Sequence, residues 1–235
     1  MKYLYTKLLM IFFVNILCGQ VFSISRVHYG GGGDWYSNPS SIPNLLKFLT
    51  TNTSIKAAHE ENRIKLSDQE LASHPYLYLT GHGNIRFNDE EIIALRNHLL
   101  NGGFLHADDN YGLNQSFRRE MKRVFPNKDF VEIPHYHRVF HSYFDMPNGL
   151  PKIHEHDGKP PQLFGLFNED KIMVLYSYES DLGDGWEDEE VHKNPNEIRL
   201  NALLMGVNII YFALTQLYVI YYRTFKKNSK RSSSK

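Results

Sequence analysis

The chain has 235 residues, 26 Lys and Arg against 26 Asp and Glu, one Cys and an apolar share of 42%. This length suits one domain with one hydrophobic core. The balanced charge argues against a nucleic-acid partner, which requires a basic surface to displace counterions from phosphates. A single Cys excludes an intramolecular disulfide and a four-cysteine zinc site. The aromatic share of 14% excludes a disordered chain, because so much ring surface has to be buried.

Residues 1–23 have the pattern of a secretory signal peptide. Two lysines precede an apolar run, and small residues suitable for cleavage follow, with Val21 and Ser23 at the −3 and −1 positions. The run is too short to span a bilayer comfortably, which disfavours an uncleaved anchor. Cys18 lacks the small preceding residue that lipoprotein processing requires. We therefore expect a chain without Cys, exported to the periplasm or the cell envelope.

Residues 223–235 contain six basic residues, no acidic residue and a Ser-rich end, which is typical of a solvated, disordered tail. The tail and the two lysines near the N-terminus account for eight of the 26 basic residues, so the chain between them carries a charge of about −8. The zero net charge is therefore the cancellation of an acidic body by basic ends. We expect that body, residues 24–222, to form a single domain.

Short apolar strands alternate with helical stretches in the first half of the body, which predicts an α/β three-layer sandwich around a mostly parallel central sheet. Asn88 and Glu91 have the spacing of a capping box at a helix start, and Gly102 and Gly103 end that helix. The expected strands are residues 25–29, 55–59, 76–80 and 104–107, and the other expected helices are residues 42–50 and 115–125.

The second half is less regular. We expect strands at residues 130–133, 163–167 and 171–178, with a hairpin turn joining the last two. The acidic segment 179–190 has oxygen ligands at alternate positions around glycines, as a calcium loop does, but its spacing does not fit the EF-hand pattern. The sequence favours a solvated acidic loop there, followed by a long apolar helix from near Asn196.

That last helix has two interpretations. Residues 202–222 carry no formal charge and precede the basic tail, which is typical of a stop-transfer anchor. Asn208, Thr215 and Gln216 lie near one helical side, which favours a helix that packs on the sheet. Both interpretations stay open, because polar residues at a helix centre raise the free energy of membrane insertion without forbidding it.

Polar, Gly-rich turns follow three of the expected strands, at residues 30–35, 81–83 and 108–112. An open α/β sheet binds ligands at the carboxyl ends of its strands, and glycine lets the backbone approach a ligand closely. We therefore expect a site with His82 as proton carrier and Asp108 or Asp109 as carboxylate partner. The residues expected to bind a ligand are Asp34, Trp35, Asn110, Tyr111, Asp181, Asp184 and Trp186, the last three in an acidic loop that closes over the site.

Histidines give a second signal. His135 and His137 lie on one side of the chain if the segment is extended, which is compatible with a metal site. His154, His156 and Asp157 form a further polar group. No carboxylate stands at a diagnostic interval and no H-E-x-x-H motif occurs, so the sequence favours solvated histidines and identifies no cofactor.

The chain resembles the exported bacterial family known as domain of unknown function 4159. The resemblance runs to about residue 215 and rests on the ordered segments GGGGDW, YLTGHG, NGGFLHADDNYG, RREMKRVFP, LPKIHEHDGKPPQ, YESDLGDGWED and RLNALLMGVNIIYFAL. It implies a class I glutamine amidotransferase-like fold, which is a flavodoxin-like sandwich. The position of the amidotransferase nucleophile falls on Asp108, and a carboxylate cannot form the thioester, so glutamine hydrolysis is not implied. The resemblance also assigns the first half of the last helix to the domain, which disfavours the anchor.

Three functional hypotheses result. The leading one is a binding or scaffold domain that holds a small polar or saccharide ligand at the strand ends. The second is a hydrolase of a saccharide or other envelope substrate, in which Asp108 or Asp109 acts with His82, helped by a metal on His135 and His137. The third is a membrane-anchored interaction subunit of an envelope complex, held by the last helix and the basic tail.

Overall fold

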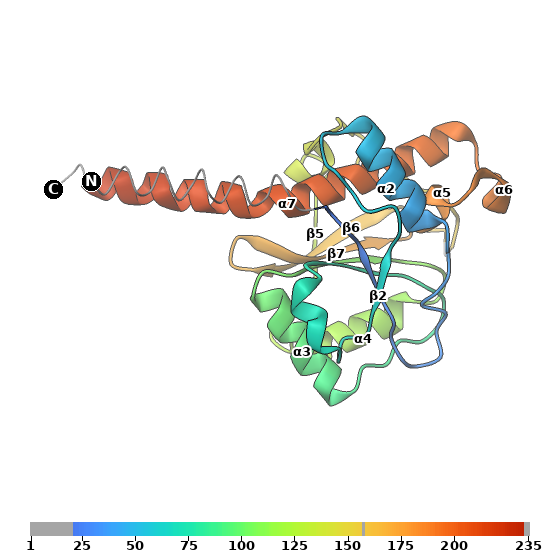
Figure 1. Ribbon diagram of the computed structural model, residues 1–235, viewed down its shortest axis with the longest axis horizontal. Helices are drawn as coiled ribbons and strands as arrows, with labels where there is room; N and C mark the ends of the chain where they lie inside the picture. Colours follow the sequence, from blue (N-terminus) through green and yellow to red (C-terminus); the bar gives the residue numbers. More distant parts are fainter. Residues whose placement is uncertain (1–20, 157, 233–235) are drawn as a thin grey trace.

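The computed structural model describes residues 21–156 and 158–232, and a seven-stranded sheet lies at its centre (Figure 1). The strand order is β2-β1-β3-β4-β7-β6-β5. The first five strands in this order are parallel, and β6 pairs antiparallel with both β7 and β5. The strands are β1 (Ser25–Val27), β2 (Asn62–Ile64), β3 (Tyr76–Leu79), β4 (Phe104–Asp108), β5 (Val131–Glu132), β6 (Gln162–Asn168) and β7 (Lys171–Tyr178).

Helices cover both faces of the sheet, which confirms the predicted α/β three-layer class (Figure 1). One face packs against α2 (Ser41–Asn52) and the first part of α7 (Asn196–Ser232), and the other against α3 (Asp89–Leu100) and α4 (Asn114–Val124). Successive side chains of β3 alternate between these two cores, so the whole strand is apolar, as parallel strands buried on both faces are. The finer flavodoxin-like and amidotransferase-like classification stays a prediction.

The capping box is present: the Asn88 side chain accepts from the Glu91 backbone N–H, and the Glu91 side chain accepts from Asn88. The strand expected at residues 55–59 is wrong, because the strand that pairs with β1 is β2. Residues 55–59 are half-buried or exposed and make one isolated bridge, between Ala57 and Phe22, whereas Ile64 of β2 is buried in the core. The signal-peptide expectation falls mainly on residues 1–20, which lie outside the described residues.

The acidic segment 179–190 is not a solvated loop. It contains all of α5 (Leu182–Trp186) and the start of α6 (Glu189–His192), and α5 packs against α2 and α7. Its buried acidic residues are Glu179, Asp181, Asp184 and Glu187. Two short 3₁₀ helices, η1 (Gln69–Ser73) and η2 (Arg138–His141), complete the described elements.

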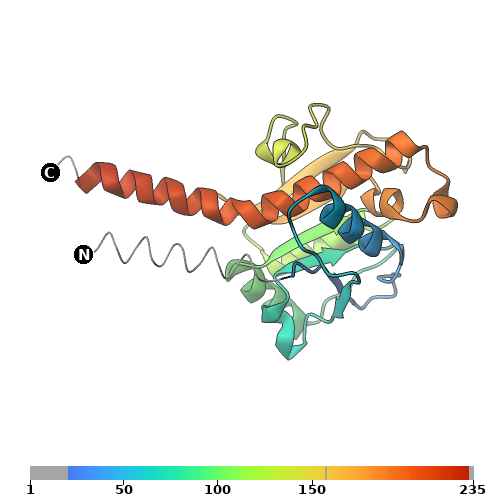
Figure 2. The same ribbon diagram turned by 45° about the horizontal axis from the view of Figure 1, so that its top comes forward.

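The segment Asn196–Gln216 of α7 is long and apolar enough to cross a membrane, yet its polar residues bond within the fold. The Asn208 side chain accepts from the backbone N–H groups of Tyr143 and Phe144 and donates to the Phe140 and Phe144 carbonyl oxygens. Gln216 bonds both backbone groups of Ile172. This part of α7 therefore completes the core. Beyond Gln216 the helix extends away from the body to Ser232, over most of the segment expected as a tail (Figures 1 and 2).

Candidate functional site

The turns that follow β1, β3 and β4 lie together, as the strand topology requires. The Gly33 N–H donates to the Asn84 carbonyl at 3.0 Å, and the Ser116 hydroxyl donates to the Gly83 carbonyl at 3.1 Å. A Cβ at Gly33 would lie 2.7 Å from the His82 carbonyl oxygen, so glycine permits this close approach. The carboxyl edge of the sheet is therefore one continuous polar surface assembled from three turns.

Asp34 and His82 pair with each other across two of these turns. The Asp34 carboxylate accepts from the His82 backbone N–H, and its Oδ2 lies 3.0 Å from His82 Nδ1. The His82 side chain is 52% exposed. Trp35, next to Asp34, stacks on the His28 ring with centroids 4.0 Å apart. The bonds of His82 to Asp34 thus hold the β1 and β3 turns together.

Asp108, at the end of β4, is fully buried and hydrogen-bonded through both oxygens. Its Oδ1 accepts from the Ser177 hydroxyl at 2.5 Å and from the Leu182 N–H at 3.3 Å. Its Oδ2 accepts from the Gly183 N–H at 2.6 Å and from the Tyr78 hydroxyl at 3.3 Å. Burial raises the pKa of Asp108 to about 7, and the bonds from Ser177 and Gly183 oppose that rise. Asp108 therefore joins β4 to β7 and to the start of α5.

Buried His106 lies behind this carboxylate, with Nε2 3.0 Å from the Ser177 hydroxyl oxygen. Burial lowers the pKa of His106 to about 3, so the imidazole is neutral. The Ser177 hydroxyl donates to Asp108, so His106, Ser177 and Asp108 form one buried hydrogen-bonded chain that joins β4 to β7.

Three buried polar atoms at the carboxyl edge have no hydrogen-bond partner among the described residues: Asp109 Oδ1, Asn110 Nδ2 and Asp181 Oδ1. Asp109 is 2% exposed, and its Oδ2 accepts from the Glu179 N–H at 3.3 Å. Burial raises the pKa of Asp109 to about 6, and the Glu179 N–H, the Tyr176 hydroxyl and the charge of His156 oppose that rise. Asp181 bonds His156 through Oδ2, and the Tyr111 ring meets the His156 ring edge-on at 5.9 Å. We call these residues the unsatisfied part of the carboxyl edge, because their buried polar atoms lack hydrogen-bond partners among the described residues.

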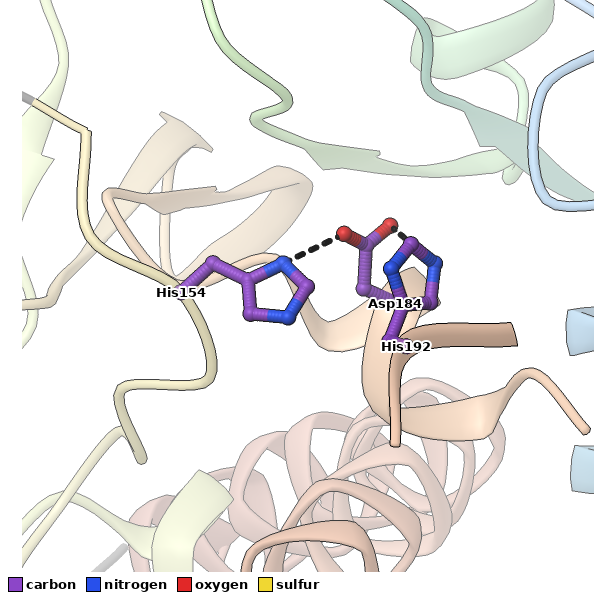
Figure 3. A group of neighbouring side chains, drawn as sticks. All are labelled: His154, Asp184 and His192. Carbon is purple, nitrogen blue, oxygen red and sulfur yellow. Dashed lines mark ion pairs between the residues drawn. The ribbon is translucent and has the colours of Figure 1, made fainter. Parts of the chain in front are cut away.

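A group of metal-ligating side chains lies beside Asp181. His154, Asp184 and His192 offer ligand atoms that all lie within 4.8 Å of one another (Figure 3). His154 Nδ1 is 2.6 Å from Asp184 Oδ2, and His192 Nε2 is 3.7 Å from Asp184 Oδ1. The hydrogen bond to Asp184 raises the pKa of His154. Burial raises the pKa of Asp184, but its bonds to His154 and Asn38 and the charges of the imidazoles bring it below the ordinary value.

His135 and His137 are not members of such a group in the part of the chain that the structure describes. His137 Nδ1 accepts from the Val139 N–H at 3.2 Å, and its ring packs against Phe212. No third ligand joins this pair in the described parts of the chain, and a metal on His135 and His137 stays a prediction. Sequence reasoning missed His192, because the three grouped ligands come from a loop, from α5 and from the end of α6.

Trp186 does not face a ligand, contrary to expectation. It is 1% exposed, its indole N–H donates to the Ala202 carbonyl at 2.8 Å, and its ring packs against Tyr78 and His106. An open surface depression lies elsewhere, between Gly30 and the start of α3, and it contains neither Asp34 nor the β4 aspartates.

The fold and the site define an α/β sandwich that buries carboxylates and imidazoles at the carboxyl ends of β4 and β7. The chain belongs to the family described as Domain of unknown function (DUF4159), whose model matches residues 23–214. No curated protein matches the chain. The family match spans β1 to the middle of α7 and so includes every residue of the site. It confirms the family resemblance, while the amidotransferase relationship stays a prediction.

Proposed function

We propose that this domain binds a small polyhydroxylated ligand, such as a saccharide, at the carboxyl ends of β4 and β7. The observation that carries the proposal is that Asp109 Oδ1, Asn110 Nδ2 and Asp181 Oδ1 are buried and make no hydrogen bond among the described residues, while the charge of Asp181 acts on the neighbouring Asp109. Native proteins rarely leave such atoms unpaired, and each costs about 1–3 kcal/mol. A ligand that satisfies all three recovers that free energy on binding.

The chemistry of these atoms supports hydroxyl groups as partners. The two carboxylate oxygens need donors and the amide nitrogen needs an acceptor, and a hydroxyl supplies both. The exposed ring of Tyr111 offers an apolar surface beside them, of the kind on which sugar rings pack. Glu179 and Asp181 both adopt a φ of 58°, and non-glycine residues in this conformation concentrate at functional sites.

Ligand entry requires part of the cover to move, since the unpaired atoms are buried. The contact between His156 and Asp181 joins the loop after η2 to the segment after β7, so its opening is the simplest route. Binding is supported over hydrolysis by the contacts of the expected catalytic residues. His82 is engaged by Asp34, and both oxygens of Asp108 accept hydrogen bonds from the protein.

Titration calorimetry of the full chain with neutral, amino and acidic sugars tests the proposal. We expect a neutral sugar to bind, and Asp109→Asn to weaken it by roughly 10- to 100-fold, the value of one hydrogen bond to a charged group. Asp170→Asn, the same change in the exposed β6–β7 turn, is the matched control and keeps wild-type affinity. Absence of binding to any sugar, or equal affinities of Asp109→Asn and wild type, would overturn the proposal.

We propose membrane-surface attachment as a second function, supported by the extension of α7 beyond the body (Figure 2). The extension ends among the six basic residues of 223–235, which attract anionic lipid. Cosedimentation with vesicles containing phosphatidylserine should be strong for the full chain and absent for a chain that ends after Gln216. That end point keeps the two bonds between Gln216 and Ile172. Equal cosedimentation of both chains contradicts attachment. An exported location stays a prediction, which N-terminal sequencing of the protein purified from cells tests.

A further inference from the structure

Three metal-ligating side chains from separate segments converge beside the carboxyl edge of the sheet. Figure 3 shows the Asp184 carboxylate between the imidazoles of His154 and His192. We propose that these three side chains bind one divalent transition-metal ion, and that Zn²⁺ fits them best. This site does not depend on the polar-ligand proposal, which concerns Asp109, Asn110 and Asp181.

The distances suit a tetrahedral ion after a small adjustment. Ligand atoms 2.0–2.1 Å from Zn²⁺ lie about 3.3 Å from one another in a tetrahedron. His192 Nε2 and Asp184 Oδ1 are 3.7 Å apart, already near that separation. His154 Nδ1 and Asp184 Oδ2 are 2.6 Å apart and have to separate by about 0.7 Å when an ion replaces the shared proton. These two distances are to different oxygens of Asp184, so the side chains have to rotate for one oxygen to face both imidazoles; the three ligand atoms already lie within 4.8 Å of one another.

Neighbouring amides orient two of the ligands. His154 Nε2 lies 3.1 Å from Asn194 Oδ1, an atom that only accepts, so Nε2 carries a proton and Nδ1 is the nitrogen available to a metal. The Asn38 amide donates to Asp184 Oδ1 at 2.5 Å. Metal-binding histidines usually donate their second N–H to such a partner, which fixes the ring orientation.

His192 supplies an independent observation. Its Nε2 is buried and makes no hydrogen bond among the described residues, although it faces the carboxylate of Asp184. At 3.7 Å from Asp184 Oδ1 this nitrogen is within ion-pair distance but too far for a hydrogen bond, whereas coordination of a shared ion would satisfy it. Two imidazoles and one carboxylate favour Zn²⁺ over Ca²⁺ or Mg²⁺, which take oxygen ligands.

The ligand count indicates what the ion can do. Three protein ligands leave one tetrahedral position for water or a bound molecule, as in zinc sites that bind or activate a ligand. Asp181 Oδ2 lies 3.8 Å from His154 Nδ1, so the ion would sit next to the unsatisfied carboxyl edge. A bound sugar and the metal would then be neighbours.

The test is calorimetry with ZnCl₂ on the full chain after treatment with a chelator. We expect the wild type to bind one ion per chain. His154→Gln and His192→Gln should each lose more affinity for Zn²⁺ than the roughly 10- to 100-fold that removal of an orienting neighbour costs. Asn194→Ala should fall within that 10- to 100-fold range. His141→Gln is the matched control, because His141 pairs with Asp145 without a third ligand, and it should bind Zn²⁺ as the wild type does.

Wild-type protein that binds no Zn²⁺, or variants of His154 and His192 that keep its affinity, would overturn the metal site. A measurement without substitutions guards against misfolded variants. Long-range ¹H–¹⁵N spectra of the wild-type imidazoles should show Zn²⁺ shifting His154 Nδ1 and His192 Nε2 and leaving His141 in place. Shifts confined to other histidines count against the site. Because only Zn²⁺ is added, failure here leaves the sugar experiment unaffected.

Discussion

Asp109 provides the sharpest test of the buried carboxyl edge. Its pKa is raised by burial from an ordinary 3.8 to about 6. An acid whose pKa is higher in the folded state than in the unfolded state destabilises the fold once the unfolded chain has lost its proton. The penalty is absent well below pH 4, grows as the pH rises towards 6, and is complete above pH 7. Asp109→Asn cannot ionise, so it escapes the penalty.

The magnitude follows from the two pKa values, which differ by about two, equivalent to about 3 kcal/mol of unfolding free energy at neutral pH. The Asn amide keeps an oxygen for the Glu179 N–H and places its NH₂ where Asp109 Oδ1 lacks a partner. That unpaired donor has a cost, but it is the same at every pH. The prediction is therefore a difference between pH values: Asp109→Asn gains about 2 kcal/mol relative to wild type between pH 4 and pH 7.5, because at pH 4 the unfolded chain has already lost part of its proton.

Urea unfolding followed by far-ultraviolet circular dichroism at pH 4, 5.5 and 7.5 measures this gain. Asp170→Asn, at an exposed position, should track the wild type at all three pH values. A gain below about 1 kcal/mol between pH 4 and 7.5 would refute the reasoning, because it would mean that Asp109 ionises in the folded state as easily as in water. Asp109→Asn is also the variant in the sugar experiment, so its effect on stability and its effect on binding are measured separately in the same protein.

Three further predictions concern packing. Trp186→Ala should lower the free energy of unfolding by about 3–5 kcal/mol, measured by urea unfolding, because its ring fills the core. A loss below ~1 kcal/mol would contradict the burial of this ring. Gly183→Ala should cost about 1–3 kcal/mol in the same assay, since its Cβ would lie 2.7 Å from the Tyr78 hydroxyl; an unchanged midpoint contradicts this contact. Asn208→Leu should cost about 1–3 kcal/mol in the same assay by removing the partner of two half-buried backbone N–H groups, those of Tyr143 and Phe144, whereas a helix surrounded by lipid would gain stability from this substitution.

Local patterns in the sequence predict much of the fold. The capping box at Asn88 and Glu91 and the apolar runs of β3 and β4 are set by neighbouring residues, so they can be read without tertiary information. Local sequence patterns do not predict β2, because only Ile64 of its sequence, Asn-Arg-Ile, is buried. Its place is fixed by pairing with β1, which no local pattern reveals.

The acidic segment 179–190 shows which features local sequence patterns cannot predict. Its composition indicates a solvated segment, but its buried carboxylates accept hydrogen bonds from residues far away in the chain. Asp184 accepts from Asn38 across 146 residues, and Glu187 accepts from Ser40 across 147. A sequence gives no sign of such partners, so burial of these charges could not be predicted. The group of possible metal ligands, His154, Asp184 and His192, could not be predicted for the same reason, because its members lie together only in the packed structure.

Asp108 connects these observations. It stands where the resemblance to amidotransferases places a nucleophile, yet its oxygens accept the N–H groups of Leu182 and Gly183 at the start of α5. A carboxylate in that position stabilises a helix start as an N-cap does. Because α5 carries both Asp184 and Trp186, Asp108 fixes a proposed metal ligand and a core side chain at once. Asp108 therefore fixes the start of α5, and both of its oxygens accept hydrogen bonds, whereas Asp109 has an oxygen without a hydrogen-bond partner among the described residues.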